Sequence, residues 1–315
     1  MIRALLGVLS AETLAYLVYW LAAVRKGRAR GEPPPAGTMS LPVGLGIGFG
    51  TNFLDTLGIG SFATTTSLFK FLRGVRDELI PGTLNAGHAI PTVAEALIYV
   101  SIITVDFRTL SAMIAASILG AWLGAGVVSH WSRRKIQIGL GACLIAAAVL
   151  MSMTQLQPLI ETKYHLHLIP AGGAALSLTG IRLVIGVAGN FVLGALMTLG
   201  IGLYAPCMIL VSLLGMSPKA AFPIMMGSCA FLMPAGSARF IRERKYDLKA
   251  ALGLAIGGVP GVLIAAFWVK EMSLTTVRWL VVVVVLYTAG MLLHSAATEA
   301  RAANNSAALP NPATE

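Results

Sequence analysis

The residues of this sequence that could do chemistry lie inside apolar segments. His88 and Glu95 are seven residues apart in one such segment, so a helix would place them on the same face, and Asp55 lies in the preceding apolar region. Ionisable groups at membrane depth are costly and usually face a pathway or a partner. Because histidine titrates closest to neutral pH, His88 is the expected proton carrier. The alternative for His88 is a buried histidine bonded to Asn85 or to a carbonyl, and Glu95 could pair with a basic residue.

A second candidate feature is a short glycine phrase that occurs twice. Leu57-Gly58-Ile59-Gly60 recurs as Leu199-Gly200-Ile201-Gly202, each time within an apolar stretch. Glycine permits a sharp backbone turn and close approach of a ligand. A helix that begins after such a break points its free N–H groups and positive dipole end at the gap. Matched interruptions therefore predict an anion site shared by two broken helices, whereas tight helix packing is the alternative explanation.

The expected site combines polar and glycine residues from both interruptions and from the apolar segment of His88. The expected substrate-binding residues are Asn52, Asp55, Gly58, Gly60, Ser61, Thr64, Thr65, Thr66, Ser67, Asn85, His88, Gly200, Gly202, Tyr204, Pro206, Cys207 and Ser228, and the expected proton-coupling residues are His88, Glu95 and Asp55. Hydroxyls of the Thr64–Ser67 run would replace water around the anion. No nucleophile–base set, metal-ligand spacing or nucleotide-binding motif is visible, so we expect no enzyme activity, no cofactor and no metal. The cysteines lie in apolar segments and are expected to be small buried residues.

Composition indicates a membrane protein built from helices. Of 315 residues, 57% are hydrophobic and 11% are charged, whereas soluble domains carry roughly 25% charged residues. The mean hydropathy is +0.81. The net charge of +10 comes from Lys and Arg in short loops between apolar segments, which favours topology signals over nucleic-acid binding.

The apolar segments predict an all-α protein with two related halves. We expect an N-terminal transmembrane helix over residues 1–30, repeat A over 41–153, an extracytoplasmic linker over 154–181, repeat B over 182–294, and a disordered cytoplasmic tail over 295–315. Each repeat has about five helical segments and opens with a broken or re-entrant pair that is short for a full crossing. In the first of these segments, Gly46, Gly48 and Gly50 are best explained by helix packing.

Charge along the chain predicts the orientation of these segments. Basic clusters follow the first helix (Arg25–Arg30) and occur at Lys70–Arg76, Arg133–Lys135 and Arg242–Lys245. The positive-inside rule places these clusters in the cytoplasm, with the N-terminus outside and the C-terminus inside. An odd number of segments per half then inverts the second repeat relative to the first. Matched positions such as Asp106 and Asp247 support the repeat.

Longer stretches of the chain resemble a known family of transporters. The segments Leu213–Leu252, Ile80–Ala112 and Trp131–Lys135 are similar to the TauE/SafE sulfite exporter family (TSUP), and the likeness extends from Leu41 to Leu293. The family's usual triple glycine is absent from both breaks. The resemblance implies export or exchange of small sulfur- or carbon-containing anions, such as sulfite or organosulfonates, driven by the membrane gradient.

We therefore expect a secondary transporter, an exporter of sulfite or of an organosulfonate or carboxylate, coupled to protons. Its partners would be the small anion, the proton and the lipid bilayer of the bacterial cytoplasmic (inner) membrane, without nucleic acid, and a homodimer stays open. One alternative is a sodium-coupled importer that uses Asp55, Asn52 and carbonyls of the broken helices. Another is a membrane subunit that does not transport.

Overall fold

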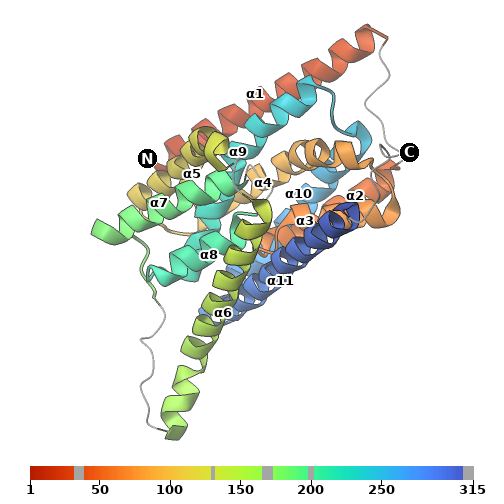
Figure 1. The fold of residues 1–315 in the computed structure, drawn as a ribbon. Coiled ribbons are helices and arrows are strands. Elements are labelled where there is room, and N and C mark those ends of the chain that lie inside the picture. The colour runs from red at the N-terminus through yellow and green to blue at the C-terminus, as the bar shows by residue number, and fades with distance from the viewer. Residues whose placement is uncertain (32–38, 129–131, 165–172, 198–201, 308–315) are drawn as a thin grey trace.

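The computed structural model of the protein describes residues 1–31, 39–128, 132–164, 173–197 and 202–307 (Figure 1). Regular structure in these residues is helical. The α-helices are α1 (Ile2–Ala29), α2 (Leu41–Thr56), α3 (Ser61–Leu72), α4 (Ile80–Ile102), α5 (Phe107–Val128), α6 (Arg133–Tyr164), α7 (Gly180–Met197), α8 (Tyr204–Leu213), α9 (Ala221–Arg242), α10 (Leu248–Glu271) and α11 (Leu274–Ala307), and the short 3₁₀ helices are η1 (Asp77–Leu79) and η2 (Pro218–Ala220).

The lengths of the helices separate those that can cross a membrane from those that cannot. Six helical stretches within the described residues are long and apolar enough to span one: Ile2–Ala29, Arg134–Met153, Gly180–Met197, Pro218–Arg242, Leu248–Glu271 and Leu274–Glu299. Helix α3 has 12 residues and α8 has 10, which gives lengths of about 18 and 15 Å. The hydrocarbon core is about 30 Å thick, so neither short helix can cross it alone. The predicted all-α membrane protein is confirmed.

The order of elements in the first half recurs in the second. The series α2, α3, η1, α4, α5, α6 is followed by α7, α8, η2, α9, α10, α11. Corresponding aspartates cap the start of a helix in both series. The Asp106 side chain accepts hydrogen bonds from the backbone and hydroxyl of Thr109 at the start of α5, and Asp247 accepts from Ala250 N at the start of α10. Both carboxylates cap a helix that follows a turn, as the capping preference of Asp explains.

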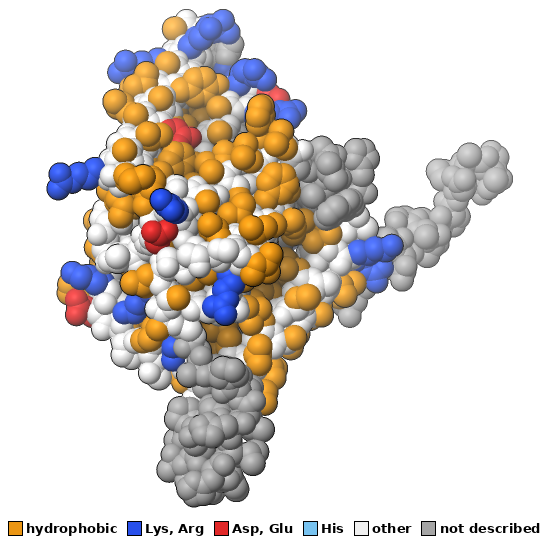
Figure 2. All heavy atoms as spheres, turned by 90° about the vertical axis from the view of Figure 1, so that its left-hand side faces the viewer, with side chains coloured by type: hydrophobic (Ala, Val, Ile, Leu, Met, Phe, Trp, Pro, Cys, Tyr) orange, Lys and Arg blue, Asp and Glu red, His pale blue; other side chains and the backbone are white. Residues whose placement is uncertain are grey.

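Glycines bring helices of the two series into close contact. Helix α2 packs along α10 and α5 along α7, while α4 packs against α9 and α6 against α11 (Figure 1). A side chain at Gly48 would meet the backbone of Gly253 and Leu254, and one at Gly194 would meet the backbone of Ser117. Such small-residue contacts are the usual interface of membrane helices. Hydrophobic side chains cover much of one outer face of the molecule, as a lipid-facing surface requires (Figure 2).

The turns of the described chain gather at two opposite ends. At one end, Gly27 lies beside the Arg244 side chain, Gly82 beside Lys245 O and Gly74 beside Met39. At the other end, the chain before α7 pairs with two turns: Ser217 N donates to Ala175 O (2.8 Å) and Asp106 N donates to Leu176 O (2.9 Å). The start of α6 pairs with the far end of α11, because Gln137 Nε2 donates to Ser295 Oγ (3.1 Å). The four basic clusters of the sequence therefore lie at one end of the molecule.

Two helices run further than the sequence indicated. Helix α6 continues to Tyr164, into the region expected to be a linker, and α11 continues to Ala307, into the region expected to be a disordered tail. Both extensions are polar but rich in strong helix formers such as Ala, Gln, Leu and Glu, and these favour helix without an apolar pattern. Residues 308–315 lie outside the described residues.

Helix α1 is attached to the body by aromatic residues. The Tyr16 hydroxyl donates to Ala86 O in α4 (3.1 Å), and Trp20 Nε1 donates to the Tyr246 hydroxyl in the α9–α10 turn (3.1 Å). Burial raises the pKa of Tyr246, with the Trp20 hydrogen bond acting in the opposite direction. These contacts fix the first helix against both series rather than leaving it free in the bilayer.

Candidate functional site

The first glycine phrase separates α2 from α3. Gly58 has φ +95° and Gly60 has φ +88°, a region that residues with a side chain rarely adopt, so the two glycines permit the reversal. The Asp55 carboxylate spans the turn: Ser61 N donates to Oδ1 (2.8 Å) and Ser61 Oγ donates to Oδ2 (2.9 Å). The predicted break is confirmed. Its positive helix end, where we expected a substrate anion, is occupied in this structure by a carboxylate of the chain.

The hydroxyl side chains at the start of α3 face different sides of the helix. Thr65 is fully buried and lies 3.0 Å from His88 Nε2 through its Oγ1. Thr64, Thr66 and Ser67 instead donate to backbone carbonyls of their own helix. Positions four apart share a face of a helix, so Ser61 and Thr65 face the interior together. Two hydroxyls from α3, rather than five, are therefore directed into the polar interior.

His88 is held by one residue on each side of the break. Its Nδ1 lies 2.9 Å from Asn52 Oδ1, and Asn52 Nδ2 donates to Gly48 O (2.7 Å). The amide orientation leaves Oδ1 as acceptor, so Nδ1 carries the proton and Nε2 accepts from the Thr65 hydroxyl. Asn85 does not join this group, because its Nδ2 donates to Pro81 O on the partly exposed side of α4. His88 is thus bonded to two side chains, and neither is Asn85.

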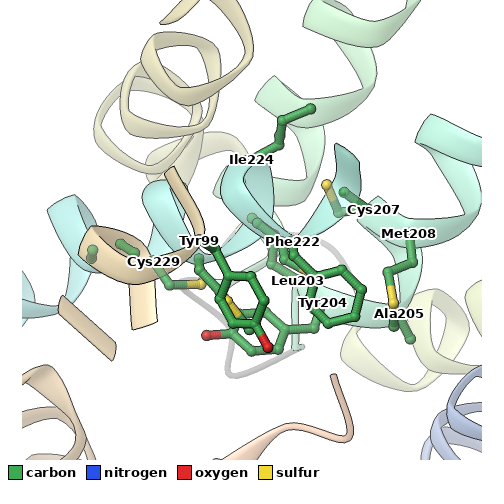
Figure 3. Packing of buried hydrophobic residues seen from close by; sticks show 14 of the residues in the cluster. Tyr99, Leu203, Tyr204, Ala205, Cys207, Met208, Phe222, Ile224 and Cys229 are labelled. Atoms are coloured by element: carbon green, nitrogen blue, oxygen red, sulfur yellow. The ribbon is translucent and has the colours of Figure 1, made fainter. Parts of the chain in front are cut away.

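Glu95 lies about two helical turns after His88 on the same face of α4 and is fully buried. Its Oε1 lies 2.8 Å from Thr56 Oγ1 at the end of α2, and the Tyr204 hydroxyl at the start of α8 donates to its Oε2 (3.2 Å). The Tyr99 hydroxyl donates to Thr56 O (3.3 Å), and the Tyr99 ring stacks on Phe222. Figure 3 shows Tyr99 and Tyr204 next to Phe222 in this packed layer. One carboxyl therefore joins residues next to both interruptions.

The second interruption lies between α7 and α8. Gly200 lies outside the described residues, and Gly202 is exposed with open space where a side chain would be. Pro206 is in the first turn of α8, where its missing N–H is harmless, and Cys207 is fully buried. The two regions touch, because a side chain at Gly58 would meet the end of Met208 in α8 at 2.9 Å.

A separate polar pair lies near α5. Asn190 Nδ2 donates to Met113 O (2.7 Å) and to Ser228 Oγ (3.3 Å), and its Oδ1 is buried without a partner. Ser228 is therefore engaged by α7 rather than by the His88 face. Cys229 is buried, with its Sγ 3.7 Å from Met197 Sδ. Cys143 is exposed, contrary to the expectation that all cysteines are buried. Cys143 lies on a surface-facing position of α6.

The interior polar cluster has an unusual charge balance. The buried ionisable residues of types Asp, Glu and His are Asp55, His88, Glu95 and Asp247, and no Lys or Arg side chain is buried in the described part of the chain. The same residues contain no group of three or more His, Cys, Asp or Glu that could hold a metal ion. The expected site residues included Asp55, Thr65, His88, Glu95 and Tyr204 but not Thr56, whose hydroxyl contacts Glu95. The position of Thr56 directly beside Asp55 was the available signal.

Comparison with known proteins identifies the family. Comparisons with curated proteins and with solved structures gave no match. The family model described as sulfite exporter TauE/SafE matches residues 1–151 and 182–313, which is nearly the whole chain. It therefore covers both glycine phrases, the α4 face with His88 and Glu95, and the long helices of both series. The chain belongs to the TauE/SafE sulfite exporter family.

Proposed function

We propose that the protein is a secondary transporter that exports a small anion such as sulfite or an organosulfonate, with a proton as coupling ion. The observation that carries the proposal is the convergence of the two helix interruptions on one buried carboxyl. Glu95 contacts Thr56 at the end of α2 and Tyr204 at the start of α8. Breaks within membrane helices persist where they line a cavity or are buried in protein. Polar residues gathered at such breaks are typical of a transport site.

The anion would sit between the two breaks and use inward-facing donors of α3. In this structure the Ser61 hydroxyl and backbone N–H bond to Asp55, and the Thr65 hydroxyl bonds to His88, so an anion that uses these donors would replace those partners. An anion that reaches this place meets the carboxyls of Asp55 and Glu95 with no buried Lys or Arg among the described residues to balance them. Protons are then the available neutralising charges, which supports coupling of the anion to protons.

The recurring order of elements supports two inverted repeats that rock about the site. The pairing of α2 with α10 and of α5 with α7 exchanges equivalent helices between the repeats. Because the basic clusters share one end, the positive-inside rule assigns this end to the cytoplasm. Helix α1 ends at this side, so the N-terminus would lie outside and the end of α11 inside.

Anion flux into proteoliposomes tests the proposal. Purified protein is reconstituted, and uptake of sulfite and of a panel of sulfonates and carboxylates is followed with and without a proton gradient. We expect gradient-dependent flux of at least one of these anions. Absence of flux for the whole panel, with protein shown to be folded and inserted, would refute transport of this class of anion.

Two adjacent threonines supply a matched pair of variants. Thr65 contacts His88 inside the cluster, whereas the Thr64 hydroxyl bonds only to carbonyls at the start of α3. We expect Thr65→Val to reduce anion flux strongly and Thr64→Val to leave it near the wild-type rate. Equal losses would argue that the hydroxyls act through helix stability rather than through the site.

A sodium-coupled importer is the second candidate, and one observation favours it. Asp55 and Glu95 are buried carboxyls with no buried Lys or Arg among the described residues, and carboxylates also attract cations. Measuring the same flux with sodium replaced by potassium distinguishes the two. Flux that needs sodium and ignores the proton gradient would favour the importer.

A further inference from the structure

We infer that Glu95 carries a proton in this conformation while Asp55 carries the negative charge, so that Glu95 is the residue that exchanges the coupled proton and His88 is a neutral positioning residue. The assignment of one proton to one carboxyl rests on hydrogen-bond geometry. Its role in transport rests on the proposed function above.

The Thr56 hydroxyl supplies the first argument. Its Oγ1 lies 2.7 Å from Asn52 O and 2.8 Å from Glu95 Oε1. A hydroxyl has one hydrogen, a backbone carbonyl can only accept, and an ionised carboxylate can only accept. If Glu95 were ionised, one of these two short contacts would join two oxygens without a hydrogen between them. Both contacts are satisfied when Glu95 Oε1–H donates to Thr56 and Thr56 donates to Asn52 O.

The contacts of Asp55 lead to the opposite assignment. Its Oδ1 accepts from Ser61 N at 2.8 Å and its Oδ2 accepts from Ser61 Oγ at 2.9 Å. Both oxygens therefore face donors at the positive end of α3, which is the environment that stabilises a carboxylate. A proton on Asp55 would weaken the contact to a donor, whereas a proton on Glu95 completes one.

The charges around Glu95 indicate that Asp55 and Glu95 together carry one negative charge. The ionisable groups that act on or bond to Glu95 are Asp55 from α2, Tyr204 from α8, Tyr99 from α4 itself and Cys229 from α9. None of these four is cationic. Two like charges this deep, without a basic partner, cannot both remain ionised at modest cost.

His88 lies in a different arrangement. Its two ring nitrogens are matched by an acceptor, Asn52 Oδ1, and by a hydroxyl, Thr65 Oγ1, and this pattern fits the neutral ring. Neither partner is a carboxylate that would favour the charged ring. His88 therefore connects α2 and α3 across the first break and holds Thr65 toward the interior.

Loss of the Glu95 proton would change the contact between the two breaks. The Thr56 hydrogen would have to leave Asn52 O for Glu95, or the contact between Thr56 and Glu95 would open. Glu95 bridges the last residue of α2 and the first of α8, so its protonation state is coupled directly to the relation of the two interruptions. Charge on Glu95 would also oppose an incoming anion, so anion binding and proton binding at Glu95 favour each other.

Infrared difference spectroscopy of the full-length protein in lipid tests the assignment without any substrate. A protonated carboxyl has a carbonyl stretch that a carboxylate lacks. We expect this band at neutral pH in the wild type, its persistence in Asp55→Asn and its absence in Glu95→Gln. Thr56→Val, which removes the acceptor, should shift the band. A band that disappears only in Asp55→Asn, or no protonated carboxyl at all, would overturn the proton assignment even if the protein transports anions.

The role of Glu95 in transport is tested by measuring anion flux against pH, with the flux of each variant normalised to its own maximum. We expect Glu95→Gln to flatten the profile and His88→Gln to lower the rate while leaving the shape of the profile unchanged. A flattened profile in His88→Gln with a normal profile in Glu95→Gln would overturn the coupling role. Absence of flux in the wild type would instead refute the proposed function, while the infrared result would stand.

Discussion

Two glycines in α2, two residues apart, allow a sharp test of how this helix is held. A Cβ at Gly48 would lie 2.7 Å from Gly253 O and 2.7 Å from Leu254 Cα, both backbone atoms of α10, whereas a Cβ at Gly46 or Gly50 meets nothing within 4 Å. Because real Cβ atoms essentially never lie under 3.0 Å from such atoms, Gly48→Ala must move α2 and α10 apart. Overpacking of this kind costs about 1–3 kcal/mol.

The same substitution should be favourable at Gly46. Replacing glycine by alanine inside a helix gains about 0.5–1 kcal/mol when there is room. That gain also offsets part of the cost at Gly48, which leaves a net loss of about 1–2 kcal/mol there. The two variants should thus differ by about 2 kcal/mol, and each kcal/mol moves the melting temperature by roughly 2–4 °C in a domain of moderate size.

Thermal unfolding of the purified variants in one detergent measures this difference. We expect the order Gly46→Ala, wild type, Gly48→Ala from most to least stable, with Gly50→Ala close to Gly46→Ala. Anion flux should also fall in Gly48→Ala, because α2 carries Asn52 and Thr56 toward His88 and Glu95. A Gly48→Ala protein as stable as Gly46→Ala would show that α2 does not contact α10 closely at Gly48, and would contradict the placement of Asn52 and Thr56 beside His88 and Glu95.

Three further predictions follow from individual contacts. Asp247→Ala removes the cap on α10 and should cost about 0.5–2 kcal/mol in detergent unfolding, while Asp247→Asn should keep most of the stability. The Arg239 and Lys245 side chains hold the pKa of Glu243 below its usual value. The ionised Glu243 therefore stabilises the folded protein above about pH 4.5, and this contribution is lost on acidification. The difference in melting temperature between the wild type and Glu243→Gln should vanish in acid and in high salt. Gly58→Ala should reduce flux more than Gly60→Ala, since both have positive φ but only Gly58 faces Met208; equal rates would contradict a contact between the breaks.

Local patterns were enough to predict the helices and the first interruption. The Leu57–Gly60 phrase marked the end of α2 and the start of α3 because two glycines with positive φ make the turn. The spacing of His88 and Glu95 correctly placed both on the buried face of α4. The ends of α6 and α11 were missed, because a helix in polar, alanine-rich sequence has no hydrophobic pattern to reveal it.

Partners across the fold were not predictable in the same way. That Thr65 faces His88 while Thr64 does not depends on where α3 begins, which shifts every residue around the helix axis. The contact of Asn52 with His88 depends on the packing of α2 beside α4, and the contact of Tyr204 with Glu95 joins residues from opposite halves. The carboxylate of Asp55 at the start of α3 was missed because the sequence shows a charge and a helix end but not which group fills that end.

The cross-packing of the helices has a consequence for biosynthesis. Helix α2 rests on α10, whose glycines are made roughly 200 residues later, and ribosomes add about 5–20 residues per second. Helix α2 therefore remains in the bilayer, or bound to the insertion machinery, for about 10–40 s before α10 has been synthesised. A nascent chain released before α10 is made would expose the Asn52–Thr56 segment to lipid, so the interval between the synthesis of α2 and that of α10 is the period when this protein is most open to quality control.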